Sequence, residues 1–193
     1  MSGASGEGVI GRYEYIRYEK PAEAFRPYDG RCPEVARRVS DLIRGRLPEA
    51  RVEHVGSTAV PGCAGKGVVD LMLLYAPGRL AAAREALDGL GFQRHVGPNA
   101  FPEERPVRIG TIAHEGEPFR LHVHVIAADA PEAAAQVRFR DALRADPALV
   151  TEYVGGKQAA LAAGVGDGHS YNLAKEPFIQ GVLGGAVGSD ADT

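Results

Sequence analysis

A glycine-rich segment between two short apolar runs constrains the fold of this chain more than any other feature. The runs are residues 51–55 (RVEHV) and 68–75 (VVDLMLLY), and the segment between them holds four glycines, a proline, a Ser–Thr pair and one lysine. Gly56 permits a sharp backbone turn, and Ser57 or Thr58 can cap a short helix whose N–H groups would face an anion. The pattern therefore predicts two strands joined by an anion-binding turn.

Asp70 is a charged residue inside the second apolar run. Carboxylates are rarely buried unless they are paired or bind a metal ion. We therefore expect the chemistry of this chain to centre on Asp70.

Residues 119–127 (FRLHVHVIA) predict a further strand, because apolar and polar residues alternate along them. His122 and His124 share one face of that strand. If it neighbours the strand of Asp70, the three side chains project together, and His54 can approach the same place. Aspartate with histidines favours zinc, manganese, iron or nickel over magnesium, which prefers oxygen ligands. The alternative is that the two histidines only line a half-exposed sheet face.

The remaining pattern predicts a small sheet flanked by helices. Strands are expected at residues 13–18, 51–55, 68–75, 92–95, 107–113 and 119–127. Helices are expected at residues 34–47, 79–90, 132–144, 147–163 and 171–183.

Three segments resemble the GrpB family, whose fold is that of the nucleotidyltransferase superfamily. They are HVGSTAVPGCAGKGVVDLMLL from His54, FRDALRADPALVTEY from Phe139 and YNLAKEPFI from Tyr171. The resemblance covers roughly residues 14–183. It implies an α/β (α+β) fold, with a small mixed sheet flanked by helices and a helical C-terminal subdomain over the site.

The resemblance also implies a ligand. In the superfamily a Gly–Ser turn holds the phosphates of a nucleotide such as ATP, and strand carboxylates hold divalent metal, here magnesium, manganese or zinc. The corresponding phosphate or nucleotide candidates in this sequence are Gly56, Ser57, Thr58, Lys66, Arg140, Lys157, Tyr171 and Lys175. For Lys66 the alternative is a solvated loop lysine, and for Tyr171 and Lys175 it is a surface pair one helical turn apart.

This sequence departs from the superfamily pattern at the metal site. A working nucleotidyltransferase usually carries a D-x-D pair on this strand and a third carboxylate on a neighbouring one. Here Val68 and Met72 flank Asp70, and histidine stands where the third carboxylate would be. We assign catalytic roles to Asp70, His122 and His124 and metal ligation to the same three with His54. Such a set can hold a single ion, a different metal or none.

Composition limits the partners and the number of domains. The chain has 193 residues and a formal net charge of -3, which argues against nucleic acid as its main partner. No apolar run approaches the ~18 residues of a membrane helix, and two cysteines in unrelated contexts favour the reduced cytoplasm. We expect a mobile segment at 1–11, a nucleotidyltransferase-like core at 12–130, a helical part of the same domain at 131–184 and a flexible tail at 185–193.

The leading interpretation is a nucleotidyltransferase-like enzyme. It would bind a nucleoside triphosphate and a divalent metal ion, and transfer a nucleotidyl group to an unknown small acceptor or thereby activate it. One alternative is a non-catalytic folding or assembly domain, since GrpB-like domains also occur fused to an enzyme of coenzyme A synthesis. The other is a metal-dependent hydrolase or ligase that uses the His-rich cleft. The oligomeric state does not follow from the sequence.

Overall fold

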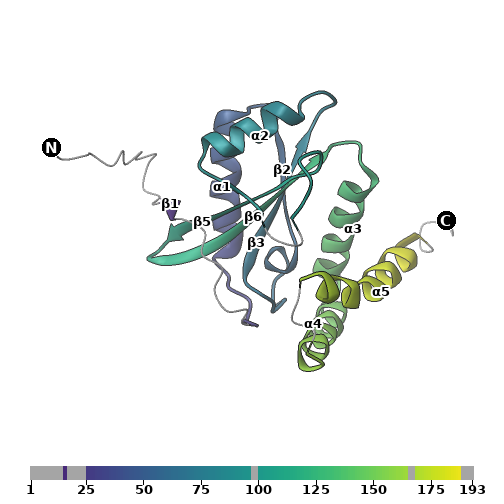
Figure 1. Cartoon of the computed structure of the whole chain (residues 1–193). Helices are drawn as coiled ribbons and strands as arrows, with labels where there is room; N and C mark the ends of the chain where they lie inside the picture. The colour runs from purple at the N-terminus through teal and green to yellow at the C-terminus, as the bar shows by residue number, and fades with distance from the viewer. Residues whose placement is uncertain (1–14, 17–24, 97–99, 165–167, 188–193) are drawn as a thin grey trace.

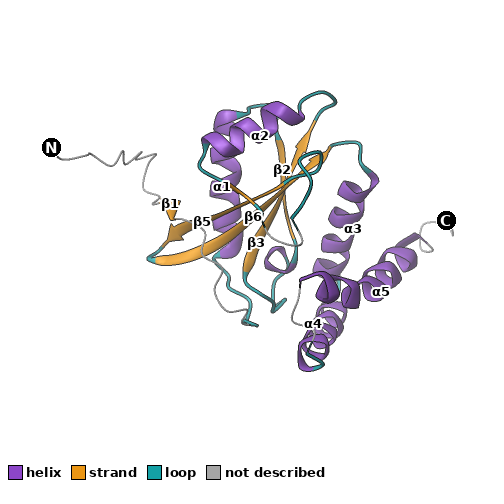
Figure 2. Ribbon diagram, in the orientation of Figure 1, coloured by secondary structure: helices purple, strands orange, loops and turns teal. Residues whose placement is uncertain are grey.

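The computed structural model describes residues 15–16, 25–96, 100–164 and 168–187, which form a mixed α/β fold (Figures 1 and 2). The strands are β1 (Tyr15–Ile16), β2 (Arg51–Val55), β3 (Val68–Tyr75), β4 (Gln93–Arg94), β5 (Val107–His114) and β6 (Glu117–Ala127). The helices are α1 (Cys32–Arg46), α2 (Leu80–Gly89), α3 (Pro131–Ala145), α4 (Pro147–Ala162) and α5 (Gly168–Val187), with the short 3₁₀ helix η1 (Ser57–Ala59) after β2.

The sheet is mixed and has the strand order β1-β5-β6-β3-β2, with β4 also paired to β5. Its central strands β3 and β6 run parallel, whereas the other pairs are antiparallel. This pairing places Asp70 opposite His122, although the two residues are far apart in the sequence. The two strands are therefore sheet neighbours, which is the condition on which the predicted site depends.

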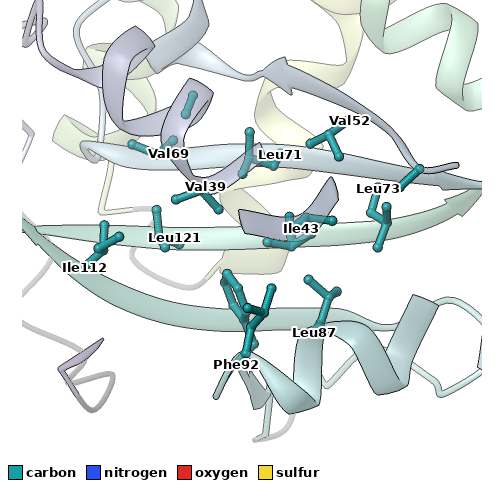
Figure 3. Close-up of a cluster of buried hydrophobic side chains, with 14 of the residues drawn as sticks. Val39, Ile43, Val52, Val69, Leu71, Leu73, Leu87, Phe92, Ile112 and Leu121 are labelled. Carbon is teal, nitrogen blue, oxygen red and sulfur yellow. The ribbon is translucent and has the colours of Figure 1, made fainter. Parts of the chain in front are cut away.

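The main hydrophobic core lies between α1, α2 and one face of the sheet (Figure 3). Helix α1 presents Val35, Val39 and Ile43 at helical spacing, and all three are buried. They pack in one cluster with Leu71 of β3 and Val123 of β6. One face of each central strand therefore packs in the hydrophobic core.

The C-terminal helices cover the other face of the sheet on its β2 side (Figure 1). An aromatic cluster joins them, because the ring of Tyr153 in α4 lies 5.3 Å from that of Phe139 in α3 and 5.3 Å from that of Phe178 in α5. Ala133 of α3 packs beside Met72 of β3. The helical half therefore lies over the sheet face that carries Asp70, as expected.

Most of the predicted elements are confirmed, with shifts at their ends. Strands β2 and β3 have the predicted bounds, whereas the last helix begins at Gly168 and runs to Val187 instead of covering 171–183. Of the strand expected at 13–18, only Tyr15–Ile16 lies within the described residues, and the segment expected to be mobile at 1–11 lies outside them. No helix in the described part of the chain has the length and apolar character needed to cross a membrane.

Candidate functional site

Asp70, His122 and His124 meet on the face of the sheet opposite the main core. Oδ1 of Asp70 lies 3.7 Å from Nδ1 of His122 and 3.7 Å from Nε2 of His124. The three ligand atoms that these residues offer lie within 4.8 Å of one another. The predicted juxtaposition is therefore confirmed, and the three side chains form what we call the Asp–His cluster. Their roles stay predictions.

The local strand geometry explains why this cluster forms. Residues alternate between the faces of β3 and β6, so Val69, Leu71, Leu121 and Val123 enter the core while the residues between them face the other way. The cluster stays partly accessible, with 24% to 27% of each side chain exposed. Its groups are close enough for one ion to bridge them and open enough for a ligand to reach.

Burial and charge set the protonation of the cluster in opposite directions. Burial alone would raise the pKa of Asp70, but contact with His124 and the charges of His122 and Lys175 bring it below its usual value. Burial lowers the pKa of His122 to about 4, although Asp70 acts to raise it. At neutral pH the cluster therefore offers a carboxylate and a neutral His122 imidazole, which are the forms that bind metal.

Gly56 allows the turn after β2 to pass close to Asp70. Its φ is +72°, and a Cβ at this position would lie 2.6 Å from Oδ2 of Asp70. Glycine is therefore needed both for the backbone conformation and for the space that the carboxylate occupies. The structure corrects the predicted cap, because Gly56 is the N-cap of η1 and neither Ser57 nor Thr58 caps it through a side chain.

The hydroxyl groups of this turn already have hydrogen-bond partners within the protein. The Lys157 ammonium donates to Oγ of Ser57 at 2.9 Å and to the Ala64 carbonyl, and Oγ1 of Thr58 donates to the Val68 carbonyl at 3.0 Å. Lys157 is 2% exposed, and burial lowers its pKa. The contacts shown for Ser57, Thr58 and Lys157 thus stabilise the turn, and phosphate binding by these residues stays a prediction.

Ser57 and Thr58 also line a cavity of about 500 Å³. Its other walls are the segment 26–32, which leads into α1, and the β6 residues 117–119. Cys63, Gly65 and Gly67 of the loop before β3 complete the lining, so the cavity touches both the main core, through Cys32 and Phe119, and the loop that packs on the C-terminal helices, through Cys63.

Lys66 and Lys175 converge on Tyr171 beside the cluster. Nζ of Lys66 lies 4.3 Å from the centre of the Tyr171 ring, and Nζ of Lys175 lies 4.8 Å from it. Burial lowers the pKa of Lys175 to about 8, while Asp70 acts to raise it. These contacts join the loop before β3 to α5, and the charge of Lys175 acts on Asp70.

Two predicted site residues lie elsewhere. His54 pairs with Leu71 across the strands and so faces away from Asp70, and its Nε2 lies 3.0 Å from Oγ1 of Thr58. Arg140 is occupied by Glu53 at 2.9 Å, by the carbonyl of His54 at 3.0 Å and by Asp141. The placement of His54 beside the cluster is therefore wrong, and the contacts of Arg140 tie α3 to β2.

His95 and Phe101, to which the sequence assigns no role, lie beside the cluster. The ring of His95 is 6.2 Å from that of His122 and 5.7 Å from that of Phe101, which in turn is 5.9 Å from the ring of His124. His95 and Phe101 belong to the segment that joins β4 to β5. Gln93 of β4 pairs with Ile109 of β5, which in turn pairs with His122 of β6, and these pairings bring the segment beside the Asp–His cluster. No sequence motif indicates this position of the segment.

Comparison with known proteins identifies the family of this chain. The protein-family model described as GrpB protein matches residues 24–184. The chain is 33% identical over 168 residues to a UPF0157 protein of Pseudomonas aeruginosa, a match that covers 83% of this chain and 66% of that protein. It is 28% identical over 178 residues to a dephospho-CoA kinase of Mycolicibacterium paratuberculosis, covering 80% of this chain and 43% of the kinase. The chain thus spans less than two thirds of the length of both relatives.

Solved structures show the same fold. The GrpB protein of Enterococcus faecalis superposes with a TM-score of 0.67 at 21% identity, over 88% of this chain and 100% of that one. The Cid1 poly(U) polymerase, in a structure with magnesium and 3'-dATP bound, superposes with a TM-score of 0.51 at 13% identity, over 78% of this chain and 49% of the polymerase. The fold is nucleotidyltransferase-like, and with the match over residues 24–184 the chain belongs to the GrpB family.

Proposed function

We propose that this protein binds a nucleoside triphosphate together with one divalent metal ion, and transfers a nucleotidyl group to a small acceptor or thereby activates it. The observation that carries the proposal is the Asp–His cluster, whose ligand atoms lie within 4.8 Å of one another in a nucleotidyltransferase-like fold. In the polymerase of the same fold, the bound ligands are magnesium and 3'-dATP.

The donor atoms of the cluster fit a single ion. One carboxylate and two imidazoles suit zinc or manganese better than magnesium, which prefers oxygen ligands. The two positions where a second carboxylate would stand carry Val68 and Met72, and Met72 is fully buried. The residues therefore do not fit a pair of ions. A bound ion would polarise a phosphoryl oxygen and offset the negative charge that develops there.

The lysines beside the cluster supply the charge that a triphosphate needs. Lys66 and Lys175 come from different segments and meet at Tyr171, close enough to Asp70 for Lys175 to lower the pKa of that carboxyl group. Their ammonium groups attract the phosphates and hold them next to the cluster. The neutral imidazole of His122 can serve as a metal ligand or accept a proton from the acceptor.

Substitution of Asp70 tests the proposal. Asp70→Asn keeps the size of the side chain but removes its charge, so the variant should lose metal binding and metal-dependent ATP binding while keeping its thermal unfolding midpoint. Calorimetric titration with manganese or zinc, and then with ATP in the presence of that ion, measures both affinities. Asp129→Asn is the matched control, because Asp129 is an exposed carboxylate in the turn after β6.

The possible results distinguish the nucleotidyltransferase-like function from its alternatives. Equal affinities in Asp70→Asn and the parent protein would contradict the role of Asp70. Metal binding without any affinity for ATP would contradict the nucleotide half of the proposal and favour a metal-dependent hydrolase or ligase in the same cleft.

A second candidate function is that of a non-catalytic folding or assembly domain. The observation that favours it is the similarity to a dephospho-CoA kinase, of which this chain spans 43%. A chain that resembles part of a larger protein can act beside another domain. A parent protein that binds neither metal nor ATP would favour this candidate.

A further inference from the structure

The segment between β4 and β5 places an aromatic residue against the Asp–His cluster. The ring of Phe101 meets that of His124 at an interplanar angle of 89° and that of His95 at 75°. His95 in turn meets His122 at 75°. Phe101 and His95 therefore connect His124 to His122 in a row of four rings, and the two end members of the row lie beside Asp70.

The chain next to Phe101 is held by an ion network centred on the buried Arg108. Glu103, two residues further on, accepts hydrogen bonds from Nη1 and Nη2 of Arg108 at 3.1 and 3.0 Å. Arg108 is 1% exposed and donates to Asp88 of α2 at 2.6 Å. Arg84 of α2 donates to the main-chain carbonyl of Glu103 at 3.3 Å. The chain around Phe101 is thereby anchored to the body of the protein.

Despite this anchoring, Phe101 keeps 37% of its surface exposed. Single exposed apolar side chains are common on protein surfaces, so the exposure of Phe101 does not by itself indicate a ligand. Phe101 differs from such residues because its ring contacts His124 of the Asp–His cluster. The ring can contact a ligand of the cluster, or it can merely shield the imidazoles from water. The two alternatives differ in whether a ligand contacts the ring.

The Asp–His cluster lies between Phe101 on one side and Lys66 and Lys175 on the other. Helix α5, which carries Tyr171 and Lys175, packs on α3 and α4 on the β2 side of the sheet, whereas Phe101 follows β4, which pairs with β5 on the other side. A ligand that occupies both sides must combine an anionic tail with a flat apolar group. A nucleoside triphosphate has this form, because its ribose separates the base from the phosphates.

We propose that Phe101 is the stacking surface for the base of the nucleotide. The inference rests on the proposed function and adds to it a residue that binds the base. Stacking tolerates different bases because every base has a π-face. The site should therefore accept several nucleoside triphosphates with similar affinity.

A comparison of ATP with inorganic tripolyphosphate tests this proposal. Both ligands carry the phosphates, but only ATP carries a base. Phe101→Ala should weaken ATP binding by about 5- to 100-fold, as expected for the loss of one stacked base, and leave tripolyphosphate binding unchanged. Phe101→Trp should keep the affinity for ATP. The control is Val96→Ala, which removes another exposed apolar side chain before the same loop.

The outcomes separate this inference from the function on which it rests. If the parent protein binds neither ligand, both proposals fail. If it binds both and Phe101→Ala changes neither affinity, or lowers both equally, only the stacking role is overturned. Phe101→Leu keeps an apolar side chain without a π-face, so it gives the same comparison should Phe101→Ala unfold.

Discussion

The two faces of the central strands β3 and β6 differ in burial and in function: one forms the hydrophobic core and the other carries the Asp–His cluster. On the α1 and α2 side, β3 and β6 present Val69, Leu71 and Val123, which are fully buried. On the other side, the residues between them are Asp70 and His122, with about a quarter of each side chain exposed. Neighbouring residues of one strand thus lie in a sealed core and in an accessible polar site.

The difference lies in what covers each face. The helices α1 and α2 bury their face in one continuous apolar cluster (Figure 3). The opposite face is covered in parts, by apolar contacts with α3 around Met72 and by the aromatic segment after β4 around the histidines. On β3 and β6, the polar cluster therefore lies where the cover is incomplete. This comparison predicts that changes on the first face affect stability and that changes on the second affect binding.

The largest expected effect is on stability, from a substitution in the sealed face. Leu71→Ala should lower the free energy of unfolding by about 2–5 kcal/mol, because it leaves a cavity in a packed core. Chemical denaturation measures this loss. The metal affinity of the folded variant should stay unchanged, since the side chain points away from Asp70. A tenfold loss of metal affinity at temperatures where the variant is folded would break the separation of the two faces.

A second prediction concerns Gly56, where the turn contacts the site. Gly56→Ala should cost about 1–3 kcal/mol, because a φ of +72° with a ψ of -172° is a conformation that essentially only glycine adopts, and it should also displace the carboxylate of Asp70. Gly62→Ala is the matched control, because Gly62 has a φ of +76° but open space around its Cβ position. Both variants should lose stability, and only Gly56→Ala should lose metal affinity in calorimetric titration. Equal metal affinities would show that Asp70 tolerates the added methyl group.

The sequence predicts the fold better than it predicts the site. Alternation in residues 119–127 and the apolar run around Asp70 are local signals, so the strands and their buried faces can be derived from them. The placement of Phe101 and His95 depends on the pairing of β4 with β5, which no short motif encodes. His54 has the residue type of a metal ligand, but strand pairing turns it to the other face. Local patterns give each side chain a face, and only the tertiary pairing shows which faces meet.

The third prediction uses His54 to distinguish a buried histidine from a ligand. Burial lowers the pKa of His54 to about 4 in the folded protein, whereas an unfolded chain keeps about 6.5. Below about pH 6.5 the unfolded chain therefore binds a proton that the folded protein excludes, so stability is full above this pH and falls towards pH 4.

The expected loss for His54 alone is about 2 kcal/mol between about pH 7.5 and pH 5. Denaturation series at several pH values should show a shallower slope for His54→Gln than for the parent protein. The slope that is left should include the contribution of His122, whose pKa is also lowered to about 4. Parallel slopes in the two proteins would contradict the lowered pKa of His54.

The smallest expected effect is on triphosphate affinity, from Lys175 at the open face. At pH 7 its ammonium form prevails because its pKa is about 8, and it lies beside Tyr171 without the hydrogen bonds that hold Lys157 in the turn. Lys175→Ala should weaken triphosphate binding by about 1 kcal/mol, roughly fivefold, at low salt. Calorimetry at increasing salt should show the difference shrinking, since a partly accessible charge is screened. Arg138→Ala removes an exposed charge on α3 and should change nothing. If both variants bind triphosphate like the parent protein at low salt, Lys175 belongs with the solvated surface charges, and the open face lacks its proposed phosphate contact.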